Sequence, residues 1–235
     1  MKFYKPRGVI CARAPDAYSL KPHTACYFPD APRELHNAGR LDGDSEGLLL
    51  MTTDGHFSHF VTRPGGEKEY LALTSCARDG RPPTACLEAL VKGVKLADGP
   101  AKALRAELVD FDGLYARLRI VVQEGRKRMV RRMLRHVGYC CMQLLRLSSC
   151  GIAGAVVPQG LAAAAQEAQL FKRHQLTATV RAARVAEDHG ALRPGDVAPL
   201  APHEVLSIYA SALEKVGRRA PRRRGHGAAP RGAWR

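Results

Sequence analysis

The pattern of hydrophobic and polar positions predicts a succession of short strands with a few helices between them. Its clearest feature is an apolar run at residues 48–51, which follows a polar loop directly and leads to the turn signal Asp54-Gly55. A short apolar run between turn signals is typical of a buried strand. Further strands are expected at residues 2–12, interrupted by a Pro-Arg-Gly turn, and at 67–74, 103–109, 114–123 and 144–147.

Three helices are expected, at residues 56–62, 82–92 and 126–138. In the third, at about 100° per residue, the apolar side chains form one stripe and three arginines lie opposite. The stripe consists of Val130, Met133, Leu134 and Val137, and the opposite arginines are Arg128, Arg132 and Arg135. Arg131 lies on the border, where a side chain reaches from the edge of the core into a cleft. Strand-rich halves with segregated helices indicate an α+β fold.

The polar loop before the apolar run contains three acidic residues within five positions, Asp42, Asp44 and Glu46. A solvated turn is the commonest state of such a loop. A calcium loop is excluded, because the glutamate that an EF-hand needs at its twelfth position falls on Thr53. The third interpretation is a catalytic carboxylate at Asp42, which the charge of Arg40 would keep ionised. Spacing alone leaves the first and third interpretations open.

The charge balance predicts a polyanionic partner, either nucleic acid or an anionic surface. The chain has 37 Lys and Arg residues against 22 Asp and Glu residues, a formal net charge of +15. From Lys215 onward there are eight basic residues and no acidic one. We expect this Arg-, Gly- and Pro-rich tail to be disordered and to act as a weak, salt-sensitive RNA tether.

The seven cysteines form no Cys-x-x-Cys pair and no zinc-like array with the histidines, so they predict free thiols in a reducing compartment and no metal site. The sequence shows no signal peptide and no apolar stretch of transmembrane length. We therefore expect a soluble cytoplasmic protein with no membrane contact.

Four segments, in the same order, resemble motifs of the RsuA-like ribosomal RNA pseudouridine synthases. The loop sequence Gly-Arg-Leu-Asp at 39–42, followed by Asp-Ser-Glu-Gly-Leu-Leu-Leu at 44–50, resembles the catalytic motif. The other three are Lys-Pro-Arg-Gly-Val at 5–9, Lys-Glu-Tyr at 68–70 and the Arg-rich segment at 124–133. One departure is Met129, where the family usually has glutamine.

The resemblance implies the pseudouridine synthase fold, a mixed and mostly antiparallel sheet in two lobes with a central active-site cleft. It also implies the large-subunit type that lacks an N-terminal S4 domain. The expected organisation is a catalytic domain at residues 1–176, an unassigned C-terminal extension at 177–212 and a disordered basic tail at 213–235.

The resemblance further implies that Asp42 is the catalytic carboxylate and that Arg131 pairs with it through a forked hydrogen bond. It implies that Tyr70 stacks on the target base, although a tyrosine in a strand is more often part of the core. The helix arginines have only Glu124 nearby in sequence to balance them, which favours phosphate binding. The expected substrate-binding residues are Arg40, Tyr70, Arg131, Lys68, Arg128 and Arg132.

The expected activity is isomerisation of a specific uridine to pseudouridine in ribosomal RNA of the large subunit. Because isomerisation involves neither redox chemistry nor group transfer, no cofactor is expected. The protein is also expected to be a monomer. Two alternatives stay open. One is a non-catalytic RNA-binding or ribosome-assembly protein on the same fold, and the other is a synthase that acts on another class of RNA.

Overall fold

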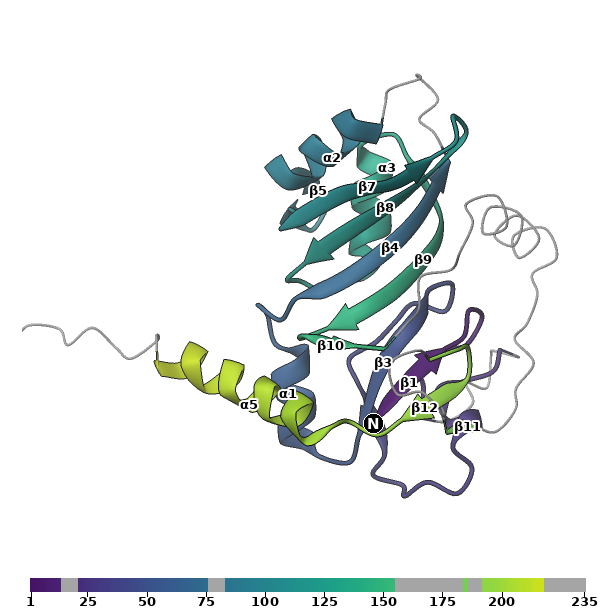
Figure 1. The fold of residues 1–235 in the computed structure, drawn as a ribbon, viewed down its shortest axis with the longest axis vertical. Helices are drawn as coiled ribbons and strands as arrows, with labels where there is room; N and C mark the ends of the chain where they lie inside the picture. The colour runs from purple at the N-terminus through teal and green to yellow at the C-terminus, as the bar shows by residue number, and fades with distance from the viewer. Residues whose placement is uncertain (14–20, 76–82, 155–183, 186–191, 218–235) are drawn as a thin grey trace, which may run out of the picture.

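The structure, a computed structural model, describes residues 1–13, 21–75, 83–154, 184–185 and 192–217 (Figure 1). Its main element is a ten-stranded sheet. The strands of this sheet are β1 (Lys2–Lys5), β2 (His36–Ala38), β3 (Glu46–Thr52), β4 (Lys68–Ser75), β7 (Arg105–Phe111), β8 (Tyr115–Val122), β9 (Cys140–Ser149), β10 (Ile152–Ala153), β11 (Arg184–Val185) and β12 (Asp196–Ala198). A separate two-stranded sheet pairs β5 (Val94–Leu96) with β6 (Gly99–Ala101).

The order of strands across the sheet is β11-β12-β1-β3-β9-β4-β8-β7, with β2 added to β3 and β10 to β9. Only the pairs β3–β9 and β11–β12 are parallel, and the others are antiparallel. The α+β fold with a mixed, mostly antiparallel sheet is therefore confirmed. β3 and β9 pair over two residues, and this short parallel contact joins the two halves of the sheet.

The helices cover different parts of the sheet (Figure 1). α2 (Pro83–Lys92) and α3 (Met129–His136) lie over the half that contains β4, β7, β8 and β9. α1 (Gly55–Thr62) and α5 (Pro202–Gly217) lie side by side at the other end. A short 3₁₀ helix, η1 (Thr24–Tyr27), packs near β1 through the contact of Tyr27 with Phe3.

The predicted buried strand at residues 48–51 is the centre of β3, and its side chains alternate between two hydrophobic clusters. Leu49 and Met51 pack into the main core, whereas Leu48 and Leu50 pack toward α1 and α5. None of the four is more than 3% exposed. Both faces of β3 are therefore covered, and the strand provides a rigid base for the loop that precedes it.

The predicted helix at 126–138 is present but shorter, because it begins at Met129. Arg128 adopts a left-handed backbone conformation with φ +52°, which ends the preceding loop and excludes residues 126–128 from the helix. The apolar stripe is confirmed, since Val130, Met133 and Leu134 are buried. Arg131, expected at its border, is also buried at 8% exposure.

The C-terminal part of the chain packs against the N-terminal part. β12 pairs with β1, and α5 contacts α1. α5 extends past residue 212, where the basic tail was expected to start, and residues 218–235 lie outside the described part of the chain. The loose helix-like pattern at 160–170 also lies outside it, so the domain boundaries stay predictions.

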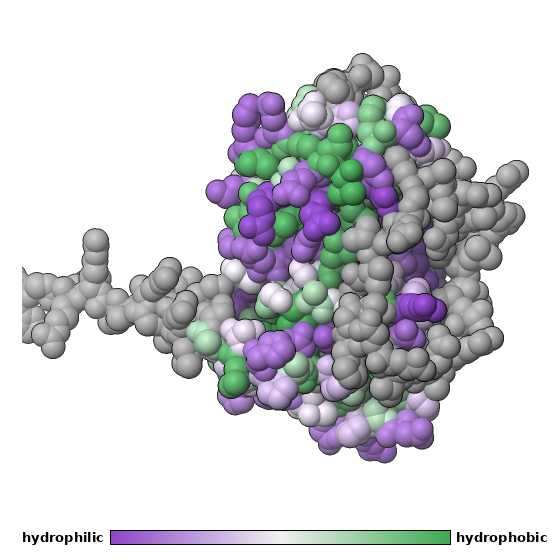
Figure 2. Space-filling model, viewed as in Figure 1, coloured by the Kyte–Doolittle hydropathy of each residue, from purple (hydrophilic) through white to green (hydrophobic). Residues whose placement is uncertain are grey.

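No helix among the described residues is both long and apolar enough to cross a lipid bilayer. On the face shown in Figure 2, hydrophobic residues are interspersed with hydrophilic ones over the half that contains β7 and β8. Leu108, Val109 and Phe111 on β7 are exposed, and a shift in register between β7 and β8 interrupts this edge of the sheet.

Candidate active site

The acidic loop between β2 and β3 is fixed by backbone hydrogen bonds and by one buried side chain. The Gly8 N–H donates to Gly43 O (2.7 Å), and the Ser45 N–H donates to Asp42 O (3.0 Å). The side chain of Leu41 is 6% exposed and belongs to the main core. Asp42 therefore stands on a rigid support, with 29% of its side chain exposed.

This loop forms one wall of a cleft of about 470 Å³. The other walls come from the end of α1, the start of β4, the connection from β8 to α3, and β9. The cleft thus lies near the parallel contact of β3 with β9, where the two halves of the sheet meet. Five predicted site residues line it: Arg40, Asp42, Lys68, Tyr70 and Arg128. The other two predicted residues, Arg131 and Arg132, do not line it.

Tyr70 lines the cleft although most of its side chain is buried. It is 8% exposed and belongs to the main core, in keeping with the usual role of a tyrosine in a strand. In the sheet it lies between Ile120 of β8 and Arg146 of β9. Lys68, two residues earlier on the same face of β4, also lines the cleft, and its Nζ donates to Gly66 O (3.0 Å).

The direct pairing of Arg131 with the Asp42 carboxylate, which the resemblance implied, is not present in this structure. Arg131 Nη2 donates to the backbone carbonyl of Asp44 (2.8 Å), and Nη1 donates to that of Cys141 (3.1 Å). Its Nε lies 3.5 Å from Asp44 Oδ1. The guanidinium thus holds the backbone next to Asp42, because its donors face carbonyl groups of the loop and of β9.

Asp44 is the carboxylate that receives the fork. Arg128 Nη1 and Nη2 donate to its two oxygens, each at 2.8 Å, and Arg128 Nη1 also lies 4.0 Å from Asp42 Oδ2. Burial alone would raise the pKa of the Asp44 carboxyl, but the hydrogen bond from Arg128 and the charge of Arg131 together lower the pKa below its usual value. Asp44 is thereby kept ionised and joins the loop to the start of α3.

The expectation that only Glu124 balances the arginines around α3 is wrong, because Asp98 is a further acidic partner. Arg132 forms a fork with Asp98 at 2.8 Å to each oxygen, and Arg126 also contacts Asp98 at 3.0 Å. These ion pairs attach α3 to the β5–β6 hairpin. The partner lies 34 residues from Arg132 along the chain, so local sequence could not reveal it. The role of Arg132 in substrate binding has no support from its position.

Three other cations that line the cleft differ from Arg128 and Arg126, because the described residues place no carboxylate within ion-pair distance of them. Arg40 and Lys127 are exposed, and the described part of the chain provides neither with an acidic partner. Arg146 lines the cleft as well but is only 3% exposed. Sequence reasoning missed Lys127 and Arg146. The signal for Arg146 was available, because it is a charged residue within the apolar strand at 144–147.

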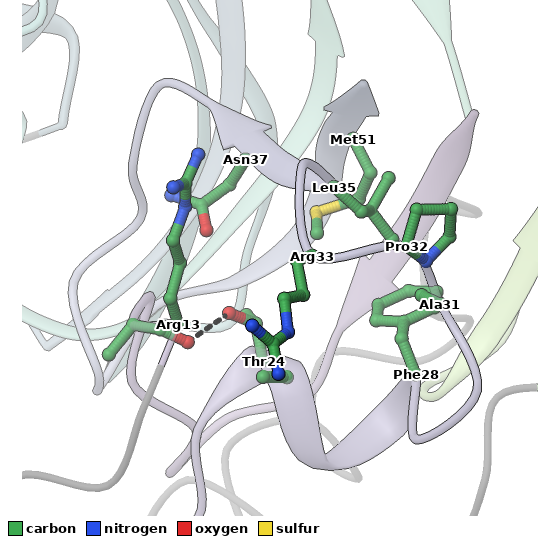
Figure 3. A pocket seen from close by; sticks show the side chains of 11 residues that line it. Arg13, Thr24, Phe28, Ala31, Pro32, Arg33, Leu35, Asn37 and Met51 are labelled. Atoms are coloured by element: carbon green, nitrogen blue, oxygen red, sulfur yellow. Dashed lines mark hydrogen bonds between the residues drawn. The ribbon is translucent and has the colours of Figure 1, made fainter. Parts of the chain in front are cut away.

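A smaller hollow of about 150 Å³ lies on the opposite face of β2, where Asn37 lines it while the adjacent Ala38 lines the cleft. Figure 3 shows Arg13 beside Asn37, with the side chain of Arg33 directed away from Asn37, and Met51 and Phe28 among the apolar lining residues. No carboxylate is among its lining residues. The hollow therefore lacks the group on which the expected chemistry depends.

Comparisons with known proteins identify the family. Residues 1–136 match the RNA pseudouridylate synthase family. The chain is 37% identical to the ribosomal large subunit pseudouridine synthase B of Bacillus subtilis (strain 168), over 61% of this chain and 58% of that protein. It is 33% identical to the ribosomal large subunit pseudouridine synthase E of Xanthomonas campestris pv. campestris, over 61% of this chain and 83% of that protein.

A solved pseudouridylate synthase structure superposes with a TM-score of 0.52 at 32% identity, covering 65% of this chain and 63% of the other. The chain spans little more than half the length of the Bacillus protein. Asp42, Tyr70 and Arg131 all fall within the family match, whereas Arg146 lies after it. The match covers more than half of the sequence, the fold agrees with it, and the chain belongs to the RNA pseudouridylate synthase family.

Proposed function

We propose that this protein isomerises a uridine to pseudouridine in ribosomal RNA, with Asp42 as the catalytic carboxylate. The observation that carries the proposal is the cleft of about 470 Å³, in which the partly exposed Asp42 carboxylate lies on a loop anchored in the core and shares the walls with Tyr70. The names of the Bacillus and Xanthomonas relatives support ribosomal RNA of the large subunit as the substrate.

The reaction breaks the bond between N1 of uracil and C1′ of the ribose, turns the base and joins C5 to C1′. Asp42 starts it either by attack on C1′ or by removal of the C2′ proton, and both routes require an ionised carboxylate. The guanidinium of Arg128 lies 4.0 Å from Asp42 Oδ2. A rigid loop keeps the carboxylate at a fixed distance from the sugar, which lowers the entropic part of the barrier.

The target base must leave its stack to reach the cleft, which costs a few kcal/mol. The enzyme must then offer an apolar surface on which the base can stack. We assign this role to Tyr70, because an aromatic ring that lines the cleft can stack on a pyrimidine. Arg40 and Lys127 are exposed cations without acidic partners in the described part of the chain, so they are suited to bind the phosphates on either side of the target nucleotide.

The test is release of the C5 hydrogen from ribosomal RNA labelled with tritium at uracil C5. The protein is expected to release tritium, and Asp42→Asn to reduce release more than about 10³-fold while RNA binding is retained. Asp30→Asn, which makes the same chemical change at an exposed position outside the cleft, should behave as the wild type. Binding without release by the wild type would favour a non-catalytic RNA-binding protein. Release only from another RNA class would favour a synthase with a different substrate.

Two further expectations stay predictions from the sequence, the cytoplasmic location and the monomeric state. Both are compatible with the proposed reaction, which needs one carboxylate, one cleft and access to ribosomal RNA.

A further inference from the structure

Arg146 is a buried cation to which the described part of the chain brings no carboxylate within ion-pair distance. It lies in β9 between leucines and is 3% exposed. Its Nε donates to the backbone carbonyl of Leu48 (2.7 Å). Within the described residues, the Nη groups have no hydrogen-bond partner and no carboxylate forms an ion pair with them. A guanidinium carries five N–H donors. The Nη groups of Arg146 are not among the fully buried side-chain atoms without a partner, so they keep access to the cleft that Arg146 lines.

The other buried cations of the described chain differ from Arg146 in this respect. Lys5 Nζ donates to two backbone carbonyls, of Pro6 and Val9, each at 2.8 Å. Arg117 pairs with the Asp110 carboxylate. Arg131 is held by the loop carbonyl and by the Asp44 carboxylate. Lys2 pairs with the Glu204 carboxylate. Lys68 lines the cleft as well, but its Nζ donates to Gly66 O (3.0 Å). Arg146 lines the cleft with Nη donors that no acceptor among the described residues meets, which indicates that these donors serve a group that enters the cleft.

The strands around Arg146 are arranged so that it reaches this position. It lies opposite Gly47 on one side and Tyr70 on the other. A Cβ atom at residue 47 would lie 2.4 Å from Arg146 O, so only glycine allows β3 to approach β9 this closely. The approach brings Leu48 O within reach of Nε, and this bond fixes the plane of the guanidinium beside Tyr70 and the cleft.

We infer that Arg146 donates hydrogen bonds to a carbonyl oxygen, O2 or O4, of the uracil and stabilises the negative charge that the base acquires as it leaves the ribose. The inference rests on the proposed function. When the N1–C1′ bond breaks, its electron pair stays on the uracil and is shared among N1, O2 and O4. C1′ gains a bond to Asp42 or the sugar loses its C2′ proton to Asp42. When C5 later bonds to C1′, the C1′–Asp42 bond breaks or, on the other route, C2′ takes its proton back from Asp42. C5 then loses its proton, and N1 gains one.

The degree of burial favours the base over a phosphate as the ligand. Phosphates remain at the rim of a cleft that admits a single flipped nucleotide, where the exposed cations Arg40 and Lys127 lie. A side chain that is 3% exposed meets only the part of the nucleotide that enters deepest. Donors fixed in advance where charge develops contribute most to the rate in such a water-poor site.

The first test compares Arg146→Met with Arg146→Lys by turnover of saturating ribosomal RNA and by RNA affinity. Removal of a donor to a developing anion is expected to lower kcat about 10²-fold in the methionine variant, with the lysine variant between it and the wild type and with RNA affinity retained. A phosphate contact would instead weaken affinity, reduce its salt dependence and leave kcat intact, and that result would overturn the inference.

The second test needs no mutation, so it decides the matter even where Arg146→Met does not fold. Substrate RNA carries 2-thiouridine or 4-thiouridine at the target position. Sulfur accepts hydrogen bonds poorly but stabilises negative charge at least as well as oxygen, so without a donor the exchange leaves kcat unchanged or raises it. We expect one of the two substrates to lower kcat. Unchanged kcat with both overturns the role of Arg146, whereas an inactive wild type on unmodified RNA overturns the proposed function itself.

Discussion

The guanidinium of Arg128 forms a forked ion pair with the carboxylate of Asp44, 84 residues earlier in the chain, with both N···O distances at 2.8 Å. The fork connects the loop that carries Asp42 to the start of α3. Arg131 strengthens the same connection through the backbone carbonyl of Asp44. Both arginines contact Asp44, which lies two residues after Asp42. The position of Asp42 therefore depends on these two arginines.

The first prediction concerns this fork. Because its side chains are 43% and 34% exposed, we expect it to contribute no more than about 1 kcal/mol to stability. Its effect on catalysis should be larger, since it positions the loop. Arg128→Met and Asp44→Asn should each lower kcat about tenfold, and the double variant should lower it no further, as coupled residues do. The initial rate of tritium release from saturating ribosomal RNA measures kcat for each variant.

The control for the fork is the ion pair of Arg119 with Glu69, which joins β8 to β4 at 2.8 Å and is similarly exposed. Neither residue lines the cleft. Arg119→Met and Glu69→Gln should reduce stability to a similar extent and leave kcat unchanged. Additive losses of kcat for Arg128→Met and Asp44→Asn would contradict the role of the fork.

The strands and helices that the sequence predicted correctly are those with a long apolar run or a regular period, such as β3, β4, β8 and α3. The missed strands are β2, β5, β6 and β12, with three residues each, and β10 and β11, with two each. A strand this short is determined by its partner instead of by its own pattern. α5 was missed although Val205, Ile208 and Tyr209 recur at helical spacing. The pattern of apolar residues thus predicts elements well only where they are long.

At the site, the sequence and the family resemblance together brought Asp42, Tyr70 and Arg128 into one cleft, as the structure has them. They did not predict which guanidinium meets which carboxylate. Arg128 and Arg131 are three residues apart, so the left-handed backbone of Arg128 decides which side chain reaches the Asp44 carboxylate and which its carbonyl. Such a choice depends on backbone geometry that residue spacing does not contain.

The second prediction is that Gly47→Ala is strongly destabilising, by more than about 2 kcal/mol. Two effects add at this position. The backbone has φ +99°, which disfavours any side chain, and a Cβ would lie 2.4 Å from Arg146 O, a backbone atom that cannot move aside. Urea unfolding of the variant measures the loss.

Two other glycines separate these effects. Gly113 has φ +92° with open space around it, so Gly113→Ala should cost only the conformational strain, about 1 kcal/mol. Gly55, the first residue of α1, has neither a positive φ nor a neighbour within 4 Å, and Gly55→Ala should be neutral or stabilising. A loss for Gly47→Ala no larger than that for Gly113→Ala would show that β3 and β9 can separate without cost.

The third prediction concerns the pH dependence of stability. Burial lowers the pKa of Lys5 from 10.5 to about 8, against the opposing charges of Cys11, Glu46 and Asp44. The folded state therefore binds fewer protons than the unfolded state between these two values, so stability rises with pH in that window. The free energy of unfolding of the wild type relative to Lys5→Met should increase by about 1 kcal/mol per pH unit from pH 8 to 10. Parallel curves for the two proteins would mean that Lys5 keeps its charge when folded.

The last prediction concerns residues 218–235, which contain seven arginines and no acidic residue. Their charge should raise RNA affinity by counterion release, so deleting them should weaken binding most at low salt. With about 0.7 for each contact to a phosphate of single-stranded RNA, the slope of log K against log salt should decrease in magnitude by up to about 5. Replacing the seven arginines by glutamine should reproduce the deletion, because charge is the cause. Turnover of saturating RNA should stay intact, and a large fall in kcat would show that these residues take part in the reaction itself.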